Sequence, residues 1–160
     1  MKRLLILGSV GAAALAVLIA NAVAASAGST LSVKTLSGAG KVLVDSKGRA
    51  LYMNDQERGR VLCTGACLSF WKPLTVSGTP KAGSLPGKLA VVKRPDGGRQ
   101  VAYNGKLLYS FTLDKSGKVT GDGFKDAFGG QKFTWHVAHP AGVKSAPSTA
   151  TATPTYPSGY

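Results

Sequence analysis

The stretch RQVAYNGKLLYSF, residues 99–111, decides the fold that the sequence predicts. Asn104-Gly105 is a strong signal for a two-residue hairpin turn, because both residue types tolerate positive φ. This turn sets Ala102 opposite Leu107 and fixes which side chains share a face. Each face then carries an apolar set: Leu107, Tyr109 and Phe111 on one, Val101, Tyr103 and Leu108 on the other. A hairpin with two apolar faces must be covered on both, which predicts a small antiparallel sandwich or barrel.

A second stretch, KVLVDSKGRALYM at residues 41–53, has the same design. Gly48 stands where its turn needs positive φ. In both stretches a turn glycine and a basic residue are followed by two apolar residues and a tyrosine. We therefore predict two related β-hairpin repeats, about residues 40–76 and 89–139, that close around a shared core.

The remaining apolar stretches are short and alternate with polar residues. Residues 89–93 are predicted to form a strand, which the turn at residues 95–98 joins to the 99–111 hairpin. KFTWHVAHP gives a closing strand that stops at Pro140. No stretch has the length and periodicity of a helix. The fold class predicted is therefore all-β.

The N-terminus has the pattern of an export signal. Lys2 and Arg3 precede an uncharged run over residues 4–20, and Ala25-Ser26-Ala27 gives a small-residue cleavage site. We predict a signal peptide over residues 1–27 and a mature chain that is secreted, periplasmic or held in the cell envelope, without an integral membrane domain. The alternative is an uncleaved anchor, because an apolar run of about 18 residues can span a bilayer.

Residues 28–143 are predicted to form one domain. Residues 144–160 are rich in Ser, Thr, Pro and Ala, which predicts a disordered tail of the kind that carries sugars. The formal net charge of the chain is +13. This surplus suits anionic partners such as envelope polymers or lipid head groups. A solvated basic surface is the alternative, since the basic residues form no block, and specific nucleic-acid recognition is not predicted.

Cys63 and Cys67 are the chain's two cysteines. In an exported chain a close pair is predicted to form a disulfide, here one that pins the loop presenting Phe70, Trp71 and Pro73. A redox-active pair is the alternative, although the C-x-x-C redox motif is one residue shorter. Zinc would need further ligands at matching spacing, and c-type haem would need C-x-x-C-H. The sequence predicts no metal and no cofactor.

No catalytic constellation stands out. His136 and His139 are the chain's two histidines, and residues three apart on a regular strand point to opposite faces. A shared metal site is therefore not predicted. Asp122 and Asp126 lie between glycines, where turn chemistry explains them as well as calcium does. No serine has the surroundings of a nucleophile, so the chain is not predicted to be an enzyme.

The segment Tyr109-Ser-Phe111-Thr-Leu-Asp114 is the sharpest motif in the chain. With VLVDSKGRALY, CTGACLSFWKP and FGGQKFTWHVAHPAG, it resembles the secreted-repeat family of unknown function. That resemblance implies a bacterial envelope lipoprotein with a Tyr-x-aromatic-x-x-Asp motif. The first repeat matches at Tyr52, with an asparagine in place of the aromatic residue and Glu57 in place of the aspartate. The usual lipid-attachment cysteine is missing.

Two interpretations of the motif remain. In the structural one, Tyr109 and Phe111 belong to the core and Asp114 caps the following turn. In the functional one, a ligand pocket is lined by Trp71, Tyr52, Tyr109, Phe111 and Asp114.

The predicted function is a non-catalytic binding or structural module of the cell envelope, with a basic surface and no established biochemical activity. The alternative is an accessory extracytoplasmic redox protein. Its electrons would pass through the cysteine pair or through an aromatic cluster of Trp71, Tyr109 and Trp135.

Overall fold

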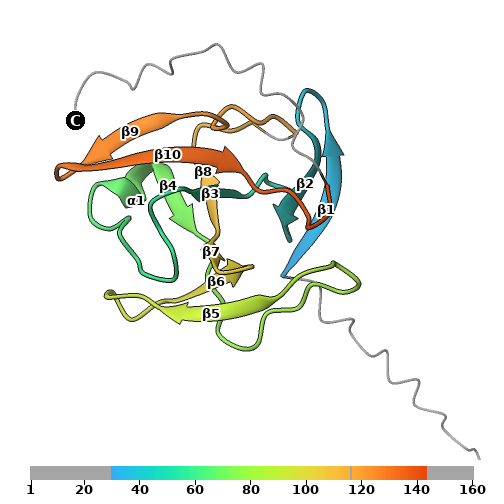
Figure 1. The fold of residues 1–160 in the computed structure, drawn as a ribbon, viewed down its shortest axis with the longest axis horizontal. Helices are drawn as coiled ribbons and strands as arrows, with labels where there is room; N and C mark the ends of the chain where they lie inside the picture. Colours follow the sequence, from blue (N-terminus) through green and yellow to red (C-terminus); the bar gives the residue numbers. More distant parts are fainter. Residues whose placement is uncertain (1–29, 116, 144–160) are drawn as a thin grey trace, which may run out of the picture.

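A computed structural model describes residues 30–115 and 117–143. The predicted signal peptide, residues 1–27, and the predicted tail, residues 144–160, lie outside the described residues. Within the described part the chain is built from β-strands and one helical turn, α1 (Cys67–Phe70). Figure 1 shows the strands wrapped around a common centre. The all-β prediction is confirmed.

Three antiparallel sheets make up the fold. The central sheet has the strand order β4 (Trp71–Pro73), β8 (Tyr109–Phe111), β3 (Tyr52–Asn54), β10 (Gln131–Val137) and β9 (Lys125–Phe128). A second sheet joins β5 (Leu89–Lys93), β6 (Arg99–Tyr103) and β7 (Lys106–Leu107). A two-stranded ribbon of β1 (Leu31–Leu36) and β2 (Gly40–Asp45) lies at the right of Figure 1. The described residues contain no helix that could span a bilayer.

The hairpin at residues 99–111 has the predicted register. Ala102 pairs with Leu107, and the turn places Asn104 and Gly105 at φ values of 49° and 80°. The two predicted faces enter different cores. The larger core cluster holds Leu107, Tyr109 and Phe111, and the smaller holds Val101, Tyr103 and Leu108. Both faces are therefore covered, as the apolar pattern predicts.

The first hairpin differs from its prediction. β2 and the segment leading into β3 meet only around the bridge between Val44 and Ala50, beyond which β3 leaves the hairpin. It pairs instead with β8 through Tyr52 and Tyr109, and with β10 on its other side. A β-strand has two hydrogen-bonding edges, and both edges of β3 are taken by strands of the second repeat.

The prediction that Trp71 sits in a presented loop is wrong. Trp71 starts β4, pairs with Phe111 of β8 and is 0% exposed. Its local sequence ends one helical turn and begins a strand of three residues. That is too short for either periodicity to be read from the sequence.

The two predicted repeats exchange strands. β4 of the first repeat pairs with β8 of the second, and β10 of the second pairs with β3 of the first. The registers are equivalent: Trp71 faces Phe111 and Pro73 faces Tyr109, while Trp135 faces Asn54 and Val137 faces Tyr52. In the central sheet, β3 and β4 of the first repeat therefore pair with strands of the second repeat.

Two rings of backbone hydrogen bonds close the exchange. In one, Leu43 donates to Ala138 at 2.7 Å, Ala138 to Leu51 at 2.7 Å, and Leu51 to Leu43 at 2.9 Å. The other ring repeats this pattern with Val101 donating to Leu74, Leu74 to Leu108, and Leu108 to Val101. Each ring thus ties one repeat's hairpin to the residue that follows a strand of the central sheet.

Candidate functional site

The motif tyrosine of the second repeat contacts the carboxylate of the first. The Tyr109 hydroxyl donates to Oε1 of Glu57 at 3.0 Å. The same oxygen accepts the backbone N–H groups of Leu62 at 2.6 Å and Cys63 at 2.7 Å, and Oε2 accepts Nδ2 of Asn54 at 2.9 Å. Glu57 is 1% exposed, so a buried carboxylate anchors the loop that leads to Cys63.

The motif tyrosine of the first repeat contacts the carboxylate of the second. The Tyr52 hydroxyl donates to Oδ2 of Asp114 at 2.6 Å. Oδ1 of Asp114 accepts both the backbone N–H and the hydroxyl of Thr120, at 2.8 and 2.7 Å. Glu57 and Asp114 lie at the same spacing after their tyrosines. The motif therefore links the two repeats, because each tyrosine donates a hydrogen bond to the carboxylate of the other repeat.

Both tyrosines stay protonated over a wide pH range. Burial raises the pKa of Tyr52 far above its ordinary value, and the charge of Asp114 raises it further. Burial likewise raises the pKa of Tyr109, with a further contribution from Glu57. Burial raises the pKa of Asp114 as well, against the opposing hydrogen bonds from Tyr52 and Thr120. The phenols act as hydrogen-bond donors, which suits a structural clasp.

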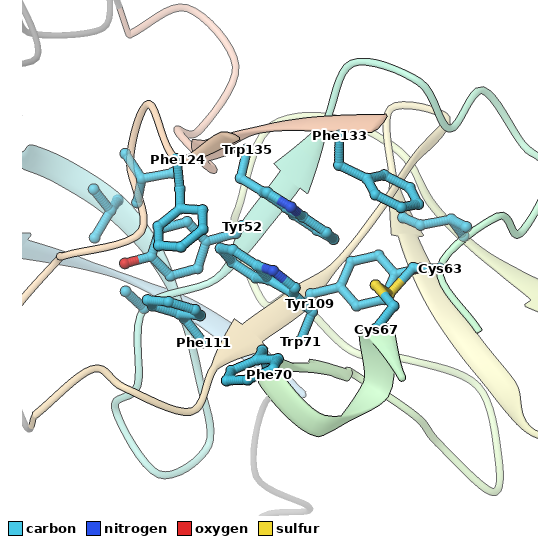
Figure 2. Close-up of a cluster of buried hydrophobic side chains, with 14 of the residues drawn as sticks. Tyr52, Cys63, Cys67, Phe70, Trp71, Tyr109, Phe111, Phe124, Phe133 and Trp135 are labelled. Carbon is cyan, nitrogen blue, oxygen red and sulfur yellow. A yellow bond between two sulfur atoms is a disulfide. The ribbon is translucent and has the colours of Figure 1, made fainter. Parts of the chain in front are cut away.

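The exchanged strands bring two tryptophans face to face, as Figure 2 shows. The rings of Trp71 and Trp135 stack with centroids 3.8 Å apart and planes 9° apart. Phe111 stacks on the other face of Trp71, at 4.2 Å. Both indole N–H groups donate to Asp126, Trp71 at 2.8 Å and Trp135 at 3.0 Å. The prediction from sequence assigned Asp126 to turn chemistry, whereas its carboxylate joins the two repeats.

The predicted disulfide between Cys63 and Cys67 is confirmed. Both cysteines are 0% exposed and pack in the larger core cluster. Glu57 accepts the N–H of Cys63, and the buried guanidinium of Arg94 donates to the Cys63 carbonyl at 3.0 Å. Arg94 also donates to Gln100 at 2.6 Å. The bridge is thus held from two sides.

Four of the five predicted pocket residues are core residues. Trp71, Tyr52 and Tyr109 are 0% exposed and Phe111 is 3% exposed, while Asp114 is partly exposed at the edge of this cluster. The structure brings these residues together but packs them against one another. It therefore supports the structural interpretation of the motif.

A surface pocket of about 520 Å³ gathers titratable residues near the end of β10. Both His136 and His139 line it, with Asp55, Lys106 and Asp122. His136 Nε2 lies 3.1 Å from Asp55, and His139 Nδ1 lies 2.8 Å from the carbonyl of Lys41. The sequence predicts that the two imidazoles point to opposite faces of one strand. Both line the same pocket, because β10 ends at Val137 and the alternation of side chains ends with it.

The carboxylates of this chain are committed to its own structure. All seven Asp and Glu residues lie in the described part, and each accepts at least one hydrogen bond there. Glu57 and Asp126 act inside or at the edge of the core, and Asp122 accepts the N–H of Val137 at 3.0 Å. Among described lysine and arginine side chains, only Arg49 and Arg94 form an ion pair with a carboxylate.

Sequence reasoning missed Glu57, Arg94 and Asp126 as organising residues. Glu57 could have been found, because it stands at the same spacing after Tyr52 as Asp114 does after Tyr109. Asp126 has no such signal, since its partners are brought together only by strand exchange.

The geometry defines an all-β module in which two similar segments clasp each other through exchanged strands and tyrosine–carboxylate pairs. Residues 90–139 match a family described as a secreted repeat of unknown function. The predicted family resemblance is confirmed for this stretch, which coincides with the predicted second repeat. The family's description as secreted agrees with the predicted export. No curated protein and no solved structure matches the chain.

Proposed function

We propose that this protein is a non-catalytic module of the cell envelope whose basic surface binds anionic polymers or lipid head groups. One observation carries the proposal: every carboxylate has an internal partner, whereas nearly all described lysines and arginines lack an acidic one. Exposed lysines such as Lys34, Lys118 and Lys132 therefore leave the positive charge facing solvent. A surface with unneutralised positive charge attracts polyanions.

The motif residues support a structural role beside this surface. Their tyrosines are buried hydrogen-bond donors, and the cysteine pair is enclosed by the core. Thiol–disulfide exchange requires access of an attacking thiolate to a sulfur. The burial of both cysteines favours a structural disulfide over the redox alternative. Electron transfer through Trp71, Tyr109 and Trp135 stays a prediction.

Binding to vesicles of stated composition tests the proposal. The mature chain should bind vesicles containing phosphatidylglycerol at low salt and should not bind phosphatidylcholine vesicles. Exposed charges are screened over about 8 Å at physiological ionic strength, so the affinity should fall steeply as salt rises. Equal binding to both vesicle types, or binding insensitive to salt, would contradict an electrostatic surface.

A further inference from the structure

One pocket combines several positive charges. It has a volume of about 340 Å³ and lies between the loop after Glu57 and the turn that follows β5. Its lining includes Arg60, Lys93 and Arg94, with Val61 and Val92 as apolar walls. No carboxylate is part of this lining.

Two of the three cations are uncommitted. The side chains of Arg60 and Lys93 are exposed and form no hydrogen bond or ion pair with a described residue. Arg94 is 2% exposed and held by Asp96, Gln100 and the Cys63 carbonyl. Arg94 is therefore a fixed part of the wall whose charge Asp96 balances, while the other two side chains are free to reach a ligand.

The register of the β5–β6 hairpin places a further positive charge, that of Arg99, beside Lys93 but outside the pocket lining. Lys93 lies directly opposite Arg99 across the two strands. Like charges in directly opposite positions destabilise a sheet. Arg99 donates to the carbonyl of Ser77 at 2.7 Å and has no carboxylate partner among the described residues. A bound anion would relieve this repulsion.

The loop on the other side of the pocket contributes Gly59, Arg60 and Val61 to its lining. Gly59 has φ = +75°, a backbone conformation that residues with a side chain rarely adopt. The N–H groups of residues 58–61 donate to no other described residue. Consecutive free N–H groups at a turn with a left-handed residue are a common setting for anions.

We infer that this pocket binds the phosphate groups of an anionic ligand, through Arg60 and Lys93. The inference rests on the proposed function, since it gives the basic surface a preferred contact. A guanidinium matches the oxygens of a phosphate in a two-point contact, and an ammonium adds a point charge. The shared chemistry is a phosphate or phosphodiester, carried by a polymer or by a lipid head group.

A matched pair of double variants tests the inference. Arg60→Gln with Lys93→Gln removes two charges from the pocket. Lys125→Gln with Lys132→Gln removes two from the β9–β10 hairpin, where both side chains are exposed. We expect the pocket variant to lower the affinity for linear polyphosphate at low salt at least tenfold, and the control variant about twofold. Thermal unfolding of both variants should match that of the parent.

The outcomes separate the two proposals. If both variants lose affinity equally while the parent binds in a salt-dependent way, the pocket inference is wrong and the basic surface stands. If the parent binds neither polyphosphate nor phosphatidylglycerol vesicles, the proposed function fails as well. Binding of polyphosphate without vesicles would identify a polymer as the source of the phosphate. Loss of vesicle binding in the pocket variant would identify a head group.

Discussion

The two tyrosine–carboxylate pairs perform one task at different depths. Glu57 is enclosed and collects four hydrogen bonds, from a tyrosine, an asparagine and two backbone N–H groups. Asp114 is partly exposed and collects three, two of them from Thr120. The same kind of contact therefore anchors a loop from inside the core on one side and closes an outer turn on the other.

The difference follows from what surrounds each carboxylate. Where the second repeat has Phe111, which stacks on Trp71, the first has Asn54, which bonds to Glu57. The first repeat thus replaces an aromatic contact by a polar network, and that network also holds the disulfide. The comparison teaches that the motif can lose its aromatic residue and still join the two repeats. In this case a polar side chain in the aromatic position, Asn54, donates a hydrogen bond to the motif carboxylate.

The largest effect is expected for Glu57→Ala. The substitution leaves the partly buried N–H group of Leu62, the buried N–H group of Cys63 and the Tyr109 hydroxyl without their acceptor. Each unsatisfied buried group costs about 1–3 kcal/mol, so the free energy of unfolding should fall by at least about 3 kcal/mol. Urea denaturation measures it. Asp114→Ala, the matched change on the outer side, should cost less, and an equal cost would end the distinction between the two pairs.

Removal of the disulfide should have the next largest effect. Cys63→Ser with Cys67→Ser opens a short loop, whose closure stabilises the fold by roughly 2 kcal/mol. Because the exchanged strands remain, far-ultraviolet circular dichroism should still show the folded sheet. Complete unfolding of this variant at room temperature would mean that the bridge, and not Glu57, holds this side of the molecule together.

Removal of one hydroxyl from each pair sharpens the comparison. Tyr109→Phe and Tyr52→Phe each delete a hydrogen bond to a carboxylate, worth about 1–2 kcal/mol. The loss should be greater for Tyr109→Phe, because its acceptor is the more buried. Thermal unfolding of the two variants side by side gives the order, and the reverse order would contradict the argument from depth.

The pH dependence of stability gives the smallest effect. Burial raises the pKa of Asp114 above its ordinary value of 3.8, so the folded state holds this proton more tightly than the unfolded chain. The corresponding stability is fully present below about pH 3.8 and is lost as pH rises through the folded-state pKa. Asp114→Asn removes this titration. Urea denaturation from pH 3.5 to 7 should show that the variant loses less stability than the parent over this range. The same pH dependence of the free energy of unfolding in both proteins would contradict the prediction.

Local patterns in the sequence predict what is formed by neighbouring residues. The turn at Asn104 and Gly105 fixes the hairpin register, and the alternation after it assigns each side chain to the correct core. β5 has the predicted bounds, residues 89–93. The spacing of Cys63 and Cys67 predicts their bridge.

Strand exchange lies beyond local pattern. The pairing of Tyr52 with Tyr109, and the stacking of Trp71 on Trp135, join residues far apart in the chain. Alternation states which face a side chain occupies but not which strand lies beside it. The role of Asp126 depends on that exchange. The candidate pocket at Arg60 and Lys93 also joins two distant loops, which is why scattered basic residues gave no sign of it.

Strand exchange also sets an order of events during synthesis and export. β3 needs β10, and Glu57 needs Tyr109, so the N-terminal half has no complete set of partners until the C-terminal half is available. Because the chain is made from its N-terminus, the apolar surfaces of Trp71 and Tyr52 stay uncovered until β8 and β10 have been made. Contacts of this sequence separation slow folding. In an exported protein this delay is useful. A chain that cannot finish folding early stays unfolded enough to pass through a membrane channel until its last strand has been translocated.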